Sequence, residues 1–289
     1  MISEYKFIRI ILGALQDEIS LMHKGNIIKL SKITSFWYRR GSFKFNLSNK
    51  ILSSNEVDYL NWYNREIYFL KETIYDILKR KKHIGDLRNN RLNKIEVLLK
   101  ARECGINIPK ILITNKKQKL KDFIDKHKFK VITKSIKDNL YSKLNDSTYV
   151  MQYTAEVESN LFNSLPKTFG YSLFQEYIEK KFELRIFFLN KEFYAMAIFS
   201  QNNPKTKIDF RRYDTENPNR TMPYLLPKKI ENKLTKLMNL LNLNSGSIDM
   251  IVSKNNKYVF LEVNPVGQFG QVSLPCNYNI EKKIAKYLL

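Results

Sequence analysis

Two acidic side chains near the carboxyl end of the chain have the spacing of a metal site. Residues 247–264 show the pattern of a strand, a polar turn and a second strand. If the turn is a two-residue loop at 255–256, Asp249 faces Glu262 across the two strands. Because every second residue of a strand shares a face, Asn264 lies on the same face, one step along. Three oxygen donors are therefore expected to converge.

The negative charges of Asp249 and Glu262, which face each other, need to be neutralised. Two carboxylates opposite each other on a sheet repel, unless a cation bridges them or one of them holds a proton. A small set of oxygen donors suits Mg²⁺ or Mn²⁺, which keep bound water and share coordination with substrate phosphates. The pattern predicts a divalent-metal site at Asp249, Glu262 and Asn264. A solvated polar face on an edge hairpin is the alternative that the pairing leaves open.

Composition narrows the classes of partner and of nucleotide site. Lys and Arg number 50 against 28 Asp and Glu, so the net charge is +22 and the surface attracts nucleotide phosphates, acidic peptides or nucleic acid. Lysine-rich loops encoded by an AT-rich genome would give part of the same excess. The chain has only nine glycines and contains neither a P-loop nor a dinucleotide-binding glycine motif. A Walker-type NTPase, a Rossmann site and a protein kinase are all disfavoured.

The counts of cysteine and histidine exclude other classes of site. Two cysteines and three scattered histidines cannot assemble a disulfide framework or a structural zinc site. No stretch approaches the roughly 18 to 20 apolar residues that cross a bilayer. The first 19 residues include Glu4, Lys6, Arg9, Asp17 and Glu18, where a signal peptide would be apolar. We therefore expect a cytoplasmic protein with no membrane partner.

The elements that position the acidic residues follow from periodicity. Apolar spacing predicts helices at 56–80, 92–104, 118–126 and 230–241 and at the carboxyl end, and Gly105 has the place of a helix-ending glycine. Extended patterns predict strands at 108–114, 130–134 and 148–156, then two or three antiparallel strands over 173–199 with a tight turn at 190–191. Residues 86–93 are polar and are typical of a linker.

Several motifs, taken in order, resemble the ATP-grasp superfamily, and within it the peptide-macrocyclising ligases that make graspetides, especially the maturases of grasp-with-spasm systems. The motifs are Asn93-Lys94 with Gly105, Pro109 and 113–115; 174–178 with 183–185; 209–211; Pro223-Tyr224 with Leu226-Pro227; and 246–249 with 261–269. Each motif is weak alone, whereas their order and spacing are specific. The resemblance covers roughly residues 86–289.

This resemblance implies an α+β protein with the ATP-grasp fold, in which two α+β subdomains grip ATP. The domains would be a small α/β N-terminal domain at 1–88, a central subdomain at 89–172 and a C-terminal subdomain with the metal site at 173–289. Members of the group usually begin with an additional strand and helix before the segment that resembles residues 7–10. The N-terminal domain is therefore expected to be shortened.

The resemblance also implies roles for single residues. Lys94 and Lys134 resemble the lysines on the phosphates and the adenine side, and Glu183 resembles the carboxylate on the ribose hydroxyls. The backbone of Gln175, Glu176, Tyr177 and Ile178 resembles the hinge that reads adenine. Arg185, which shares a strand face with Glu183, and Arg211, which follows Asp209, would be the catalytic arginines. The alternative for the two lysines is a solvated surface position. For Glu183 and Arg185 it is an ion pair on one face of a hairpin, and for Asp209 and Arg211 it is a charged loop.

The function that the resemblance implies is ATP-dependent carboxylate ligation. Asp or Glu side chains of a precursor peptide would be activated as acyl-phosphates, with ADP released, and Thr or Ser hydroxyls, or a Lys amine, would then close ester or amide macrocycles. ATP and Mg²⁺ or Mn²⁺ would be the cofactors, an acidic, Thr/Ser-containing precursor peptide the partner, and a homodimer the assembly. The alternatives are another ATP-grasp ligase that adds amino acids to a protein tail, and a non-catalytic, basic nucleic-acid-binding protein. Only the aromatic and basic cluster at 36–40 favours the last.

Overall fold

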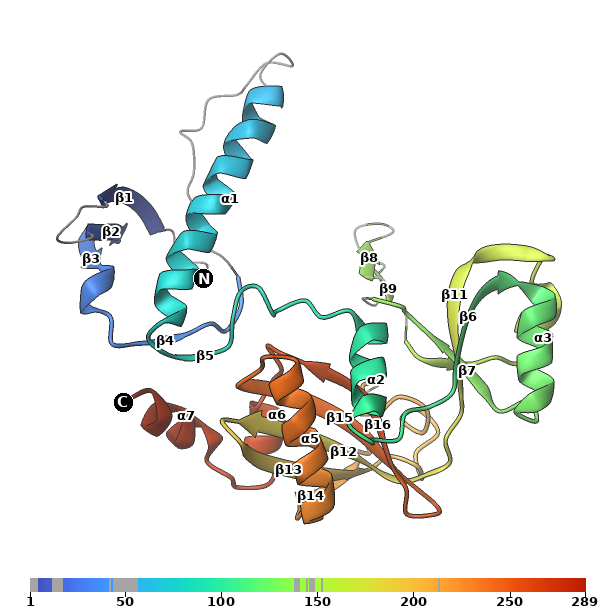
Figure 1. The fold of residues 1–289 in the computed structure, drawn as a ribbon. Coiled ribbons are helices and arrows are strands. Elements are labelled where there is room, and N and C mark those ends of the chain that lie inside the picture. The colour runs from blue at the N-terminus through green and yellow to red at the C-terminus, as the bar shows by residue number, and fades with distance from the viewer. Residues whose placement is uncertain are drawn as a thin grey trace. The chain divides into compact units, whose positions relative to one another are not determined.

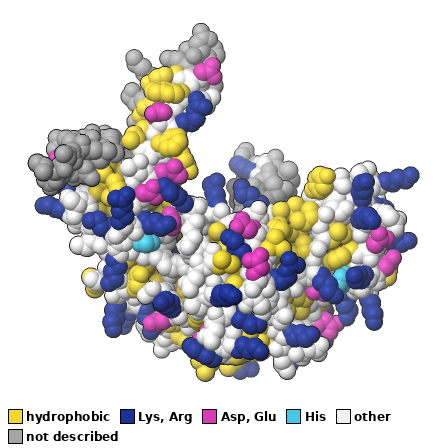
Figure 2. Space-filling view, viewed as in Figure 1, with side chains coloured by type: hydrophobic (Ala, Val, Ile, Leu, Met, Phe, Trp, Pro, Cys, Tyr) yellow, Lys and Arg dark blue, Asp and Glu magenta, His cyan; other side chains and the backbone are white. Residues whose placement is uncertain are grey.

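The structure, a computed structural model, describes residues 5–11, 18–41, 43, 57–137, 141–143, 145, 149–151, 153–212 and 214–289. The chain divides into two compact units, one of residues 1–90 with 281–289 and one of residues 91–280 (Figure 1). Among the described residues, no helix is long and apolar enough to cross a membrane. Lys and Arg side chains are spread over the visible face of the molecule, as the net charge requires (Figure 2).

The first unit contains a three-stranded antiparallel sheet, a long helix and a two-stranded parallel ladder. The sheet has the order β1-β2-β3, from β1 (Tyr5–Ile11), β2 (Glu18–His23) and β3 (Asn26–Lys29). After the short 3₁₀ helix η1 (Leu30–Lys32), β4 (Ser35–Trp37) pairs with β5 (Lys82–Ile84) on either side of α1 (Val57–Lys79). The helix predicted at 56–80 is confirmed.

The carboxyl end of the chain groups with this first unit. Helix α7 (Ile280–Leu288) is the predicted C-terminal helix, and residues 281–289 belong to the same compact unit as residues 1–90. The ammonium group of Lys82 lies 5.6 Å from the centre of the Tyr287 ring, within the range of a cation–π contact. The chain therefore returns to its first unit after completing the second.

A four-stranded antiparallel sheet with the order β10-β7-β11-β6 forms one half of the second unit. Its strands are β6 (Ile111–Lys116), β7 (Val131–Lys134), β10 (Ala155–Glu156) and β11 (Thr168–Glu176). Helices α3 (Lys117–Lys126) and α4 (Ser159–Ser164) accompany it, and β8 (Tyr141–Lys143) pairs with β9 (Tyr149–Met151). Leu120, Ile124, Val131 and Phe174 are buried between the helices and the sheet.

A five-stranded antiparallel sheet with the order β14-β13-β12-β15-β16 forms the other half. Its strands are β12 (Lys180–Leu189), β13 (Glu192–Phe199), β14 (Arg220–Tyr224), β15 (Ser245–Ser253) and β16 (Tyr258–Asn264). Helices α2 (Lys94–Glu103) and α5 (Lys228–Leu240) contribute buried apolar side chains to its core, and α6 (Gly270–Ser273) follows β16. Two residues with positive φ, Asn190 and Lys191, form the predicted tight turn between β12 and β13.

The sheet topology bears on the expected division of the second unit. Strand β11 crosses the expected boundary between residues 172 and 173, and it pairs with β6 and β7 up to Glu176. The stretch from 173 to 176 is therefore part of the four-stranded sheet. The assignment of three domains at 1–88, 89–172 and 173–289 stays a prediction.

Candidate functional site

A row of charged residues crosses three neighbouring strands of the five-stranded sheet. Asp249 on β15 pairs with Glu262 on β16 and, on its other side, with Arg185 on β12. Ser247 pairs with Asn264 one step along. The prediction that Asp249 faces Glu262, with Asn264 on the same face, is therefore confirmed.

The turn of this hairpin differs from the prediction. Ser253 donates its backbone N–H to the carbonyl of Lys257 at 2.9 Å, so the loop contains the three residues 254–256 instead of two. The register then shifts by one residue at Leu261, where a β-bulge lies next to Asp249 and its partner. The predicted two-residue loop is wrong, and the bulge offsets the extra loop residue. The two deviations cancel, so the acidic residues still face each other.

Arg185 neutralises Asp249 in this structure. Its Nη1 atom donates to both carboxylate oxygens, at 2.9 and 2.7 Å, and the two side chains are only 12% and 13% exposed. Burial raises the pKa of Asp249 to about 6, with the nearby charge of Glu262 adding to the rise and Arg185 opposing it. The Nε atom of Arg185 is buried with no hydrogen-bond partner within the described part of the chain. Arg185 therefore contacts an expected metal ligand in this structure.

The second carboxylate, Glu262, lies among cations. Lys94 is 3.4 Å away at its Nζ atom, at the start of α2. Burial alone would raise the pKa of Glu262, but Lys94, Lys134 and Arg211 together lower it. Burial lowers the pKa of Lys134 to about 8; the charges of Lys94 and Arg211 add to the fall, and those of Glu262 and Asp209 oppose it. The structure thus brings both predicted lysines into the electrostatic field of one carboxylate.

Asp209 and Arg211 form a chelated pair in the loop between β13 and β14. The guanidinium donates from Nε to Oδ1 at 2.8 Å and from Nη2 to Oδ2 at 2.7 Å. Asp209 is buried and also accepts from the backbone N–H of Thr154 at 3.4 Å. Burial would raise the pKa of Asp209, but the bonds from Arg211 lower it overall. This two-point contact fixes the plane of the Arg211 guanidinium.

Half of the twelve predicted site residues line one cavity, which we call the charged cavity. Its polar lining consists of Lys134, Thr154, Gln175, Glu183, Asp209, Arg211, Asp249 and Glu262. These residues come from β7, the segment before β10, β11, β12, the loop after β13, β15 and β16, so the four-stranded and the five-stranded sheet both contribute. The predicted residues Lys94, Glu176, Tyr177, Ile178, Arg185 and Asn264 are not part of this lining.

The hinge segment contributes a side chain that the sequence did not single out. Gln175 is 2% exposed, and its Oε1 atom has no hydrogen-bond partner among the described residues although it borders the charged cavity. The backbone N–H groups of Glu176 and Tyr177 donate to the carbonyls of Lys110 and Lys130, at 3.0 and 2.8 Å. These two N–H groups are therefore used within the sheet, and the side chain of Gln175 is an acceptor that this segment offers to the cavity. Sequence reasoning assigned recognition to the backbone alone because a glutamine inside a strand carries no distinctive pattern.

The donor chemistry of the facing pair fits Mg²⁺. Asp249 and Glu262 supply carboxylate oxygens, and the exposed Asn264 supplies an amide Oδ1 that accepts from the backbone N–H of Val266 at 3.1 Å and keeps a second lone pair. Across the described ranges, no group of three or more His, Cys, Asp or Glu side chains could hold a metal ion. Two carboxylates and one amide suit an ion that retains water and takes further oxygens from phosphate.

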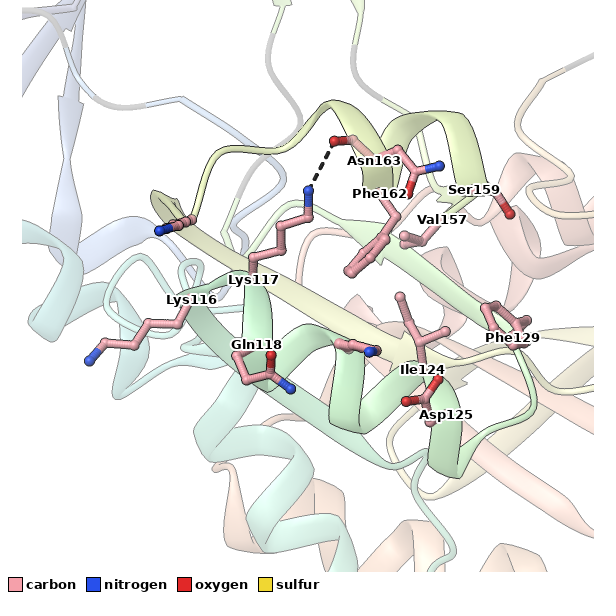
Figure 3. A pocket seen from close by; sticks show the side chains of 12 residues that line it. Lys116, Lys117, Gln118, Ile124, Asp125, Phe129, Val157, Ser159, Phe162 and Asn163 are labelled. Atoms are coloured by element: carbon pink, nitrogen blue, oxygen red, sulfur yellow. Dashed lines mark hydrogen bonds between the residues drawn. The ribbon is translucent and has the colours of Figure 1, made fainter.

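A second cavity, of about 730 Å³, lies between α3 and α4 (Figure 3). Ile124, Val157, Phe129 and Phe162 provide its apolar lining, and Phe129 is 70% exposed. Its polar rim contains Lys116, Lys117, Lys121 and Lys167 with the single acid Asp125. We call this surface the basic groove. Lys117 holds the end of α4 by donating to the carbonyls of Asn163 and Leu165, at 2.9 and 2.7 Å.

The chain matches one protein family and several solved structures. Over residues 88–288 the sequence matches the family described as RimK-like ATP-grasp domain. A search of curated proteins found no match. The macrocyclase MdnC of Microcystis aeruginosa MRC, bound with precursor peptide MdnA, is similar at 26% identity and a TM-score of 0.75, over 99% of this chain and 86% of that chain.

Two further solved structures share the fold. A RiPP-associated ATP-grasp ligase of Chryseobacterium gregarium, in complex with ADP and a leader and core peptide, is 26% identical with a TM-score of 0.80, over 99% of this chain and 83% of that chain. The ATP-grasp ligase PsnB, complexed with minimal precursor, Mg and ADP, is 15% identical with a TM-score of 0.64, over 97% and 83% of the two chains. At 15% identity, the last similarity concerns the fold alone.

Proposed function

The chain belongs to the RimK-like ATP-grasp family, and from that premise we propose that it is an ATP-dependent ligase that closes macrocycles in a ribosomally made precursor peptide. The ATP-grasp fold predicted from the sequence is confirmed by the family match and by the structural similarities. The observation that carries the proposal is the charged cavity, in which Lys134 and Arg211 lie beside the facing pair of Asp249 and Glu262. Family membership argues against the non-catalytic nucleic-acid-binding alternative.

The chemistry explains why ATP is needed. A side-chain carboxylate is a poor electrophile, so an Asp or Glu of the peptide first attacks the γ-phosphate of ATP, which yields ADP and an acyl-phosphate. A Thr or Ser hydroxyl, or a Lys amine, then attacks the acyl carbon, loses its proton and releases phosphate as the ring closes. Positioning and charge neutralisation are the main tasks of a protein in phosphoryl transfer. No protein nucleophile is required.

Each charged residue has a task in this scheme. Lys134 and Lys94 supply positive charge to the phosphates, and Arg211, held flat by Asp209, is oriented to meet charge that develops on the transferring group. Mg²⁺, or Mn²⁺ as the alternative ion, would neutralise phosphate charge when held by Asp249, Glu262 and Asn264. Arg185 contacts Asp249 in this structure, so we expect it to orient that ligand and to keep its charge compensated.

The basic groove suggests how the peptide is held. Its lysine rim and apolar lining are complementary to a peptide segment with acidic residues around an apolar anchor. The solved relatives MdnC and the Chryseobacterium gregarium ligase are bound with precursor peptide and with a leader and core peptide, respectively. We propose that part of an acidic, Thr/Ser-containing precursor lies in the basic groove while its core reaches the charged cavity.

The remaining proposals concern assembly and location. Helix α1 exposes Tyr59, Trp62 and Phe69, which are 51%, 48% and 66% exposed, and we propose that this aromatic face supports a homodimer. Sedimentation at micromolar protein concentration tests it, and a monomer that persists there excludes the dimer. Because the reaction consumes ATP, we propose the cytoplasm as its place.

Mass spectrometry of the peptide product tests the central proposal. Co-expression with an acidic, Thr-rich precursor encoded beside the gene should give a peptide lighter by one water per ring. Addition of amino acids to a tail would make the peptide heavier instead, which would establish the ligase alternative. An unchanged mass, with the peptide present and the enzyme folded, would contradict both ligase functions.

Calorimetric titration of MgATP tests the metal ligands separately from turnover. Asp249→Asn and Glu262→Gln should each weaken MgATP binding by roughly 10-fold or more, because each removes a charge from the ion's coordination. Glu231→Gln is the matched control, since Glu231 pairs with Lys228 on the surface of α5 and lies outside the charged cavity. Wild-type affinity in both variants would remove the metal assignment.

A further inference from the structure

A buried cluster of three polar residues lies behind the charged cavity. Lys180 is 5% exposed, Glu183 6% and Ser200 0%. The ammonium group of Lys180 and the hydroxyl of Ser200 both donate to the same carboxylate oxygen, Oε1 of Glu183, with Ser200 at 2.7 Å. Such a concentration of buried polar groups needs a reason, because burying an ionised pair costs free energy that the contact only partly returns.

A β-bulge brings Lys180 to this position. Residues three apart in a regular strand point to opposite faces, so Lys180 and Glu183 would not meet. The register of β12 against β15 shifts between Lys180 and Phe182, which leaves Lys181 as the extra residue. Lys180 then pairs with Ser253 and Glu183 with Ile251, two positions that share one face of β15. The bulge therefore turns Lys180 toward the carboxylate of Glu183.

Ser200, the first residue after β13, reaches the same carboxylate. Glu183 pairs with Ile198 on β13, and Ser200, two residues further on, lies on the same face. The carbonyl of Ser200 in turn accepts from the hydroxyl of Thr206 at 3.1 Å, and that hydroxyl is 2.8 Å from Oδ1 of Asn219. The loop that carries Asp209 and Arg211 thus contacts Ser200 through Thr206, which also bonds to Asn219 at the end of that loop.

The consequence is an oriented acceptor at the cavity. Glu183 borders the charged cavity, and both hydrogen bonds occupy its Oε1 atom, while within the described part of the chain no residue donates to Oε2. Gln175 adds a second acceptor there, since its buried Oε1 has no partner among the described residues. Burial raises the pKa of Glu183, while Lys180 and Ser200 oppose that rise and favour the ionised form. Two acceptors without donors indicate a ligand that brings hydrogen-bond donors, and the hydroxyl groups of a nucleotide sugar are such donors.

We infer that Lys180 and Ser200 are positioning residues that hold Glu183 ionised and oriented toward the sugar hydroxyls of the nucleotide, and so make the site selective for ribonucleotides. This inference rests on the proposed use of ATP. It assigns the selectivity to two residues that do not touch the nucleotide. A sugar that lacks this hydroxyl would leave Oε2 without a donor once the bound nucleotide excludes water, which is the costly case for a charged acceptor.

Binding of three nucleotides tests the selectivity. In calorimetric titrations with Mg²⁺, the wild-type protein should bind ATP roughly 10- to 100-fold more tightly than at least one of 2′-deoxyATP and 3′-deoxyATP, the range for a lost hydrogen bond to a charged group. Lys180→Met and Ser200→Ala should each reduce that ratio. Lys181→Met is the matched control, because Lys181 is exposed and bonds to Asn256, and it should keep the wild-type ratio.

A double-variant comparison separates positioning from general damage. In a Glu183→Gln background, Lys180→Met should not change the ATP to deoxyATP ratio further, because the group that Lys180 positions has lost its charge. If Lys180→Met does not fold, as circular dichroism would show, Ser200→Ala carries the test alone. Equal binding of ATP and both deoxy forms by the wild-type protein, or an unchanged ratio in Ser200→Ala and in any folded Lys180→Met, would overturn the inference and leave the ligase proposal intact. Failure of the wild-type protein to bind ATP would overturn both.

Discussion

Arg185 and Asp249 stand directly opposite each other on β12 and β15, and a single guanidinium nitrogen contacts both oxygens of the carboxylate. The acidic pair of the hairpin therefore has a built-in counter-charge on one side, while Lys94 and Lys134 provide it on the other. Repulsion between Asp249 and Glu262, expected from their facing positions, is offset by these cations within the fold itself.

The Arg185–Asp249 pair should be strongly coupled in stability. Arg185→Met leaves Asp249 buried without its partner, so the free energy of unfolding in urea should fall by about 3 kcal/mol, as for other broken buried pairs. Adding Asp249→Asn to that variant should recover most of the loss, because the unpaired charge is gone. Arg212→Met, at an exposed arginine over the Tyr153 ring, is the control. Strictly additive losses would show that the two residues do not act as a pair.

ATP affinity should depend on pH through Lys134. Its pKa is lowered to about 8, so the free protein loses this positive charge as the pH rises through 8. Phosphate favours the charged form, so MgATP affinity should fall between pH 8 and 10, with uptake of up to one proton per nucleotide bound. Titrations in buffers of different ionisation enthalpy measure that uptake.

Variants locate the pH effect at this residue. Lys134→Met should fold normally, bind MgATP more weakly and lose the proton uptake above pH 8, since the titrating group is gone. Lys119→Met, on α3 and outside both cavities, should behave as the wild type. Normal ATP binding by Lys134→Met would mean that another cation faces the phosphates.

Arg211 should act on turnover more than on binding. Arg211→Lys keeps the charge and loses the two-point contact with Asp209 that fixes the guanidinium plane, so cyclisation should slow by roughly 10- to 1000-fold with a small change in ATP affinity. Single-turnover kinetics and calorimetry separate these two effects. The adjacent Arg212→Lys should remain near the wild-type rate. A near-normal rate of cyclisation by Arg211→Lys would contradict a catalytic role for Arg211 and would mean that it is only a charged loop residue.

The basic groove should control the affinity for the peptide without affecting the nucleotide. Lys121→Glu and Lys167→Glu reverse charges on its rim, so binding of the acidic precursor should weaken roughly 10-fold or more at low salt, and the difference should shrink as salt screens the charges. ATP affinity should be unchanged. Lys119→Glu carries the same change in net charge outside the groove, so an equal loss there would show that only net charge matters.

Local patterns in the sequence determined much of the framework. The two-residue alternation of strands placed Asp249, Glu262 and Asn264 on one face, and it grouped Glu183 with Arg185. The end of α2 could be read from Gly105, which has a positive φ in the structure. Alternation within one strand depends on neighbours a few positions away, so periodicity is sufficient to predict it. The facing of Asp249 and Glu262 also required the bulge at Leu261, which offsets the extra residue of the loop.

Only the tertiary structure decided which charges meet. The bulges at Lys181 and Leu261 each shift one strand relative to its partner, and the position of a bulge depends on packing between strands, which no single strand's alternation records. The charged cavity brings Gln175 of one sheet against residues of the other and of a long loop. Buried polar groups need hydrogen-bond donors and acceptors nearby, as the bond from Lys180 to Glu183 shows. Which groups lie close enough to bond depends on the whole fold.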